Sequence, residues 1–267
     1  MLDGDLTTLA FCWRVERCDG VAIGLTSHDR DLEVDGLRHR AAPGMTPSAI
    51  RRTVGLDPDT MDVAGAFDAD AITADDLLAG RWDGARVTLS AVDWTGASGH
   101  VALGQGQIGA VSLRAGAFTA ELKGPAAALA RPVAEQCSPE CRAELGDGRC
   151  RVPMAGRRRF VRVVATDGAA VTVDAAEPVA NAYGGGRLRW FGGANGGLAS
   201  AVELSAGAVL TLAAPPHFAV APGALVELVE GCDKSIATCA GRFGNALNFR
   251  GEPYLPGVDL LTRYPGP

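Results

Sequence analysis

The chain has 267 residues and a formal net charge of −6, and arginine far outnumbers lysine among its basic residues. A negative balance argues against a nucleic-acid-binding protein, which normally carries a basic excess. No stretch reaches the roughly 20 apolar residues that a membrane-spanning helix needs, and the first residues lack the basic leader of a secretory signal. We therefore expect the chain to fold in a reducing cytoplasm, where its seven cysteines would bind metal rather than form disulfides.

The N-terminal half alternates between apolar and polar positions in the manner of short strands. We predict strands at 9–15, 21–27, 32–40, 50–54, 87–93, 101–104, 107–114 and 117–122, with turns at Asp19-Gly20 and Asp35-Gly36. Thr73 can cap a short helix that Gly80 ends. Residues 1–124 are therefore expected to form a β barrel or sandwich domain, followed by a helical connector at 125–130.

Several polar or sulfur-bearing residues of this half invite a metal or catalytic interpretation. Cys12 and Cys18 lie in or beside predicted strands, where buried structural cysteine is the commoner case. His28, Asp29, Asp31 and His39 lie between hairpins, and we expect them to be solvated.

A second β block follows further along the chain. Predicted strands at 159–165, 169–174, 187–191, 201–204, 209–212 and 225–229 are separated by Gly- and Pro-rich turns. We expect them to form a small β barrel over 159–229. The glycine run at 184–197 lacks a phosphate-binding pattern and predicts only a mobile loop.

Two groups of cysteines flank this predicted barrel. The first contains Cys137, Cys141 and Cys150, and the second contains Cys232 and Cys239. We expect the two groups to meet and to share one metal centre, so that 125–158 and 230–267 form one cysteine-rich domain. No interval is the Cys-x2-Cys knuckle typical of structural zinc; the longer intervals suit a larger iron–sulfur cluster bound by four thiolates.

Five cysteines compete for four ligand positions. Cys141, Cys150, Cys232 and Cys239 form the most balanced pair of pairs, with Cys137 as a possible substitute. The residues alone leave three alternatives open: a [4Fe–4S] cluster, a zinc ion, or a reduced cysteine cluster without metal.

The segment from Gly231 to Gly257 contains Cys-x6-Cys, Arg-Phe-Gly-Asn and Asn-Phe-Arg-Gly. It resembles the C-terminal signature of the baseplate hub proteins of tailed phages and gene transfer agents. The cysteine intervals are also similar to those of the iron–sulfur tail tip protein of lambda-type phages. The resemblance implies a mainly β protein in which a C-terminal iron–sulfur domain carries the inserted barrel.

The same resemblance implies cluster ligation by Cys141, Cys150, Cys232 and Cys239. Arg242, Asn245, Asn248 and Arg250 follow the last ligand, where such side chains either hydrogen-bond the loop or donate to cluster sulfurs. The implied protein is a virion component of the tail baseplate, assembled in the bacterial cytoplasm and involved in DNA delivery. Its implied state is a homotrimeric ring, with distal tail and tail tube proteins, the central tip protein and a tail-associated peptidase as partners.

A catalytic function is the alternative hypothesis. An iron–sulfur redox protein or a tail-associated peptidoglycan hydrolase, with Glu140, Glu144 or Asp147 as acids, would fit the same segment. The sequence contains no Ser/His/Asp set, no Cys/His pair with a plausible elbow and no zinc-hydrolase motif. We therefore predict a structural protein with no catalytic residues, no specific nucleic-acid binding and no membrane span.

Overall fold

The computed structural model describes residues 8–42, 46–47, 60–66, 72–95, 99–114, 117–124, 127 and 134–255. The chain divides into two compact units, Met1–Val133 and Ala134–Pro267. The predicted strand at 50–54 lies outside the described residues, as does the predicted connector at 125–130 apart from Ala127. None of the helices in the described part of the chain is long and apolar enough to cross a membrane.

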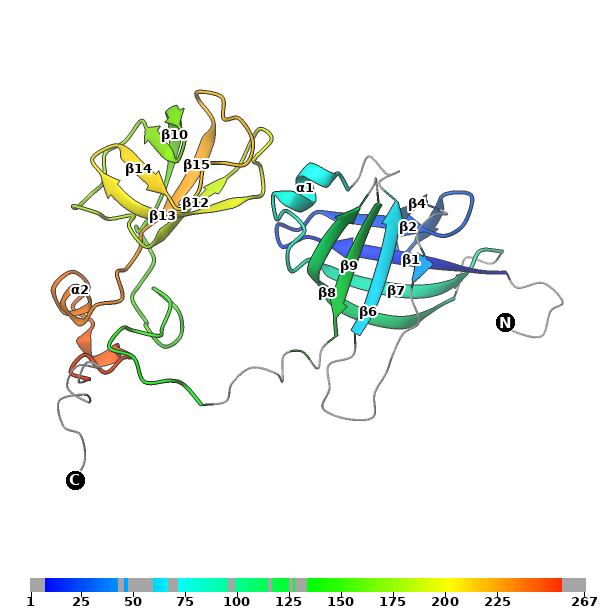
Figure 1. Ribbon diagram of the computed structural model, residues 1–267, viewed down its shortest axis with the longest axis horizontal. Coiled ribbons are helices and arrows are strands. Elements are labelled where there is room, and N and C mark those ends of the chain that lie inside the picture. The colour runs from blue at the N-terminus through cyan, green and yellow to red at the C-terminus, as the bar shows by residue number, and fades with distance from the viewer. Residues whose placement is uncertain are drawn as a thin grey trace. The chain divides into compact units, whose positions relative to one another are not determined.

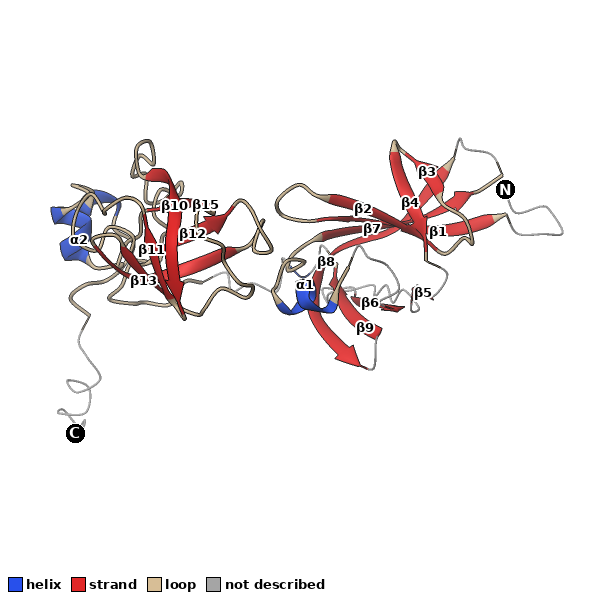
Figure 2. Cartoon of the chain, turned by 90° about the horizontal axis from the view of Figure 1, so that it is seen from above, coloured by secondary structure: helices blue, strands red, loops and turns tan. Residues whose placement is uncertain are grey.

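The first unit contains a nine-stranded sheet (Figures 1 and 2). Its order is β3-β4-β2-β1-β7-β8-β9-β6-β5. Among the strands of the described residues, only β2 and β4 pair in parallel. We expected a barrel or sandwich; the described residues form one continuous sheet whose strands line a common core. The strands are β1 (Leu9–Glu16), β2 (Ala22–Thr26), β3 (Leu32–Val34), β4 (Leu37–Ala41), β5 (Thr46–Pro47), β6 (Thr60–Ala66), β7 (Arg86–Asp93), β8 (His100–Arg114) and β9 (Ala117–Lys123).

Strand β8 is a single element of 15 residues where the sequence predicted two strands. Gly106, between the two predicted strands, permits a close approach of the neighbouring strand. A Cβ at this position would lie 2.9 Å from the carbonyl oxygen of Lys123 on β9. Register shifts against β7 and β9 interrupt the pairing of β8, and such irregularities bend a strand without ending it.

The turn and helix signals of this unit are confirmed. Asp35 and Gly36 both have positive φ, 51° and 70°, so they form the tight turn that divides the predicted strand at 32–40 into β3 and β4. Helix α1 (Ala74–Leu78) begins after Thr73, whose side chain accepts a hydrogen bond from the Asp76 amide. Gly80 follows the helix with a φ of 73°.

The hydrophobic core of the first unit includes the buried side chains of Trp13, Leu25, Trp82 and Leu89. Cys12 is buried as predicted, whereas Cys18 is exposed. The prediction that His39 is solvated is wrong. The His39 ring packs against Gly24 of β2, the strand that pairs in parallel with β4. Its Nδ1 atom lies 3.0 Å from the Leu37 carbonyl oxygen, and burial lowers the pKa of the ring.

The second unit contains a closed barrel of six strands, as the sequence predicted. The order is β10-β11-β14-β13-β12-β15, and closure leaves no free sheet edge. Val, Leu, Trp190 and Tyr183 side chains fill the interior. The strands are β10 (Arg158–Asp167), β11 (Ala170–Val173), β12 (Gly186–Trp190), β13 (Ala199–Ala206), β14 (Val209–Leu212) and β15 (Leu225–Val229).

Candidate metal centre

The first part of the glycine run packs where the barrel meets the second cysteine group. A Cβ on Gly185 would lie 2.7 Å from the Cys232 carbonyl oxygen, and one on Gly231 would overlap the backbone of Gly184 and Gly186. Gly231 also donates its amide to the Ala182 carbonyl, at 3.0 Å. Gly184 to Gly186 therefore permit close backbone packing rather than forming the predicted mobile loop.

The two cysteine-bearing segments are joined backbone to backbone. The Cys141 amide donates to the Lys234 carbonyl at 2.9 Å, and the Arg142 amide donates to the Arg250 carbonyl at 2.9 Å. The Glu252 amide donates to the Ser138 carbonyl at 2.8 Å. Segments separated by the whole barrel therefore lie side by side.

Cys141, Cys150, Cys232 and Cys239 all lie in these two paired segments. Burial raises the pKa of the Cys239 thiol, and negative charge on Cys141, Cys232 and Cys150 raises it further. Burial also raises the pKa of Cys232, with Cys141 again contributing. These effects are those of like charges that act on one another within one part of the protein.

Cys137 differs from these four cysteines. It is exposed, and it is not among the groups that shift the pKa of Cys239 or Cys232. Across the described ranges of the chain, no three His, Cys, Asp or Glu side chains have the arrangement of ligands around a single metal ion.

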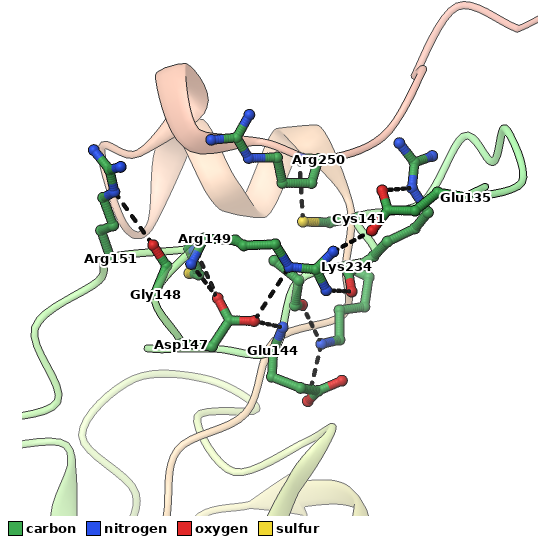
Figure 3. Close-up of polar contacts among 12 residues, drawn as sticks. Glu135, Cys141, Glu144, Asp147, Gly148, Arg149, Arg151, Lys234 and Arg250 are labelled. Carbon is green, nitrogen blue, oxygen red and sulfur yellow. Dashed lines mark hydrogen bonds and ion pairs between the residues drawn. The ribbon is translucent and has the colours of Figure 1, made fainter. Parts of the chain in front are cut away.

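Three of the four sulfurs accept hydrogen bonds. The Lys234 amide donates to Cys232 Sγ at 3.4 Å. The Arg250 amide donates to Cys141 Sγ at 3.4 Å (Figure 3). Asn245 Nδ2 lies 3.7 Å from Cys150 Sγ and donates to the Cys150 carbonyl at 2.6 Å. Donors aimed at sulfur stabilise thiolates, which are the form that binds metal.

Local turns place the second pair of cysteines. Lys234 has a φ of 62°, which turns the chain after Cys232. Helix α2 (Ile236–Gly241) then begins at Ser235, whose hydroxyl accepts a hydrogen bond from the Thr238 amide at 3.1 Å. Cys239 lies in α2 and is buried.

Asp147 shapes the loop before Cys150. Its carboxylate accepts hydrogen bonds from the amides of Cys150 at 2.6 Å, Arg149 at 2.8 Å and Glu144 at 3.0 Å. These bonds, that of Cys150 first, lower the pKa of Asp147. A carboxylate that is held ionised by backbone amides is suited to fixing the loop and not to donating protons.

The other two acids of the hydrolase hypothesis are no better placed. Glu144 forms an ion pair with Lys234, at 3.2 Å, while its side chain stays 83% exposed. Glu140 is exposed, and its amide donates to the Ser138 hydroxyl.

The four polar residues after Cys239 have different roles. Asn245 contacts Cys150, and Asn248 Nδ2 donates to Asn245 Oδ1 at 2.7 Å, which orients it. Arg250 reaches a sulfur through its backbone amide only. Arg242 points to the barrel instead: it donates to Glu230 at 2.6 Å and to the Ala182 carbonyl at 3.0 Å.

Two charged clusters around the site were missed from the sequence. Arg142 forms a double hydrogen bond with Glu252, at 2.7 and 3.0 Å. Arg157 and Arg242 both bind the buried Glu230 carboxylate, at 2.7 and 2.6 Å, and both guanidinium groups lie over the Phe243 ring. Ion pairs between residues this far apart leave no local signal in a single sequence.

Comparisons with known proteins bear on the whole chain. A family model described as baseplate hub protein, N-terminal attachment domain, matches residues 1–153. A second model, described as phage conserved hypothetical protein BR0599, matches residues 181–259. None of the curated proteins compared with the chain matches it.

One similar solved structure is a chain of the virion of a native gene transfer agent particle. The two chains are 38% identical, with a TM-score of 0.85, and the match covers 99% of this chain and 94% of the other. These findings confirm the resemblance drawn from the C-terminal signature. The chain belongs to the baseplate hub protein family and is a component of the virion tail baseplate.

Proposed function

We propose that the chain is a structural hub in which copies form a homotrimeric ring that joins the end of the tail tube to the central tip protein. The observation that carries this proposal is the likeness to a gene transfer agent virion chain over nearly the full length of both proteins. Both units and the cysteine segments therefore belong to one conserved layout. Distal tail proteins and a tail-associated peptidase are the further partners in this proposal.

The second part of the proposal is a structural [4Fe–4S] cluster held by Cys141, Cys150, Cys232 and Cys239. The donor set supports it, because the four cysteines lie in two segments paired through their backbones and three of their sulfurs accept hydrogen bonds. When bound, such a cluster supplies metal–thiolate bonds that cross-link the chain before the barrel to the chain after it. The backbone pairs around Cys141 already hold these segments in register.

Zinc remains the lesser alternative for the same four thiols. A redox or hydrolase function has less support, because the Asp147 carboxylate already accepts hydrogen bonds from backbone amides and Glu144 is exposed. An enzyme would show turnover as an isolated chain. A hub would show assembly with tail proteins and no turnover.

Deleting the coding sequence in a producing strain tests the hub function. Tails seen by electron microscopy should then lack a baseplate or stop at the tube end, and supplying the chain in trans should restore it. Sedimentation equilibrium of the purified chain should give three times the monomer mass, because the proposed ring is trimeric. Normal baseplates in the deletion strain would refute the hub function, and a different mass would refute the ring order alone.

A further inference from the structure

The outer face of β10, β15 and β12 concentrates arginine and phenylalanine. These three strands are neighbours in the closed barrel. Their alternate residues Val161, Val226 and Leu188 face the core, so the residues between them face outward. We call this surface the arginine–phenylalanine face; it consists of Arg158, Phe160, Arg162, Arg187, Arg189, Phe191, Leu225 and Glu227.

Strand pairing orders the face into cross-strand rows. Phe160, Glu227 and Arg189 are direct partners across the three strands, with Arg158 and Arg187 in the adjacent row. The Phe160 and Phe191 rings meet with their centroids 5.6 Å apart, and the guanidinium of Arg189 lies 5.7 Å from the Phe191 ring. The two rings therefore form one apolar centre bordered by cations.

The charge of this face is not balanced locally. The face has four arginines and one carboxylate, Glu227, whose side chain is only 6% exposed. Arg189 lies 3.2 Å and Arg158 3.9 Å from it, while the described residues give Arg187 no ion-pair partner. The face is therefore basic in a protein whose net charge is −6.

The rest of the barrel does not share this composition. Strands β11, β13 and β14 contain no arginine, lysine or aromatic residue. If every face of the barrel were in contact with water alone, there would be no reason for the arginines and the exposed aromatic rings to gather on the same three strands. Phe160 lies among these arginines with 63% of its surface exposed. Exposure of apolar aromatic surface to water is unfavourable in free energy.

We propose that the arginine–phenylalanine face binds an acidic segment of another virion protein, one that offers carboxylates to the arginines and an apolar side chain to the phenylalanine pair. Arginine and aromatic residues, phenylalanine among them, are enriched at protein interfaces relative to the rest of the surface. The planar guanidinium fork matches a carboxylate with two hydrogen bonds. The closed barrel offers no edge for strand addition, so recognition depends on these side chains.

Single-stranded nucleic acid fits this face less well. The planes of the Phe160 and Phe191 rings are inclined at 54° to each other, and each ring packs against the other. They therefore do not offer two separate surfaces on which successive bases could stack.

Site-specific photocrosslinking in assembled particles tests the proposal. Phe160 is replaced by p-benzoylphenylalanine, and the matched control carries the same group at Leu204, which is 57% exposed on β13. Irradiated particles should yield a crosslink from position 160 to an Asp- or Glu-rich segment of a different virion protein. Position 204 should yield at least about tenfold less of that product.

A charge reversal completes the test. Arg187→Glu should reduce the crosslink from position 160 at least about tenfold, while thermal unfolding of the purified chain stays unchanged. Crosslinks to nucleic acid, to a second copy of this chain or to a neutral protein segment would each overturn the proposal, as would no crosslink. None of these results depends on whether the cysteines bind a cluster, so failure here leaves the proposed hub and cluster standing.

Discussion

The guanidinium of Arg142 and the carboxylate of Glu252 face each other through two hydrogen bonds, of 2.7 and 3.0 Å. Arg142 follows the first ligand candidate of the N-terminal cysteine group, and Glu252 lies in the loop after Arg250. The same carboxylate accepts the Ser138 amide at 2.9 Å. This ion pair therefore closes the junction between the two cysteine-bearing segments from its outer side.

The first prediction concerns the pH dependence of this junction. The hydrogen bonds from Arg142 lower the pKa of Glu252 to about 2, from an unfolded value of about 4.3. A depressed folded-state pKa means that the stabilisation is complete above the unfolded pKa. It is lost as the pH falls toward the folded pKa.

Denaturation between about pH 4.5 and 2 tests this prediction. The wild-type chain should lose stability in that window, and Glu252→Gln should lose less, because its amide does not titrate. Equal slopes for the two chains would show that the Arg142–Glu252 pair contributes no pH-dependent stability.

The second prediction concerns the close approach of Gly251 to the first cysteine segment. A Cβ on this residue would overlap the Glu140 carbonyl. Gly251→Ala should therefore destabilise the second unit by about 1–3 kcal/mol, the usual cost of overpacking. Gly148→Ala is the matched control, because a Cβ there meets nothing within 4 Å. Urea denaturation of both variants gives the comparison, and equal midpoints would contradict the prediction.

The third prediction concerns the amide that contacts Cys150. Asn245→Ala removes the 2.6 Å bond to the Cys150 carbonyl and the donor 3.7 Å from its sulfur, and we expect a loss of about 1 kcal/mol. Asn248→Ala should have a smaller effect in the same direction, because Asn248 only orients Asn245. In a double-mutant cycle, Asn248→Ala should add almost nothing to Asn245→Ala. Additive effects would mean that the two residues act separately.

The fourth prediction concerns the cluster formed by Arg157, Glu230, Arg242 and Phe243. Glu230→Gln leaves two arginines without their carboxylate, at a buried position. We expect a loss of about 2 kcal/mol, below the full value for a buried pair because both arginines keep some contact with water. Glu203→Gln, on the exposed side of β13, is the control and should be neutral. Equal unfolding energies for the two variants would contradict the role given to Glu230.

The sequence predicted the elements better than their long-range arrangement. The six barrel strands follow from alternation and from turns such as Asp167-Gly168, which are local signals. The continuity of β8 across Gly106 could not be predicted, because it depends on the approach of β9. The burial of His39 depends on its parallel pairing with β2, which no local pattern reveals.

The candidate site shows the same difference between local features and long-range contacts. Cysteine spacing predicts that Cys141, Cys150, Cys232 and Cys239 share one site, and this stays a prediction. The sequence left open whether Arg242 bonds the loop or a cluster sulfur; its guanidinium donates to Glu230 and to the Gly231 and Ala182 carbonyls. The sulfur contacts of Lys234 and Arg250 use backbone amides. The direction of a backbone amide depends on local φ and ψ, such as the positive φ of Lys234, and not on residue type alone.

The central claim is that four cysteines from two distant segments hold one metal cluster. Analysis of iron, inorganic sulfide and zinc in the anaerobically purified chain tests it most directly. Alanine variants of Cys141, Cys150, Cys232 and Cys239 are compared with Cys137→Ala as the matched control, since Cys137 is exposed. The claim predicts about four irons and four sulfides per chain, which is the content of a [4Fe–4S] cluster. Each of the four variants should lose them, and Cys137→Ala should keep them. One zinc per chain, no metal, or loss of iron in Cys137→Ala with retention in Cys141→Ala would contradict it.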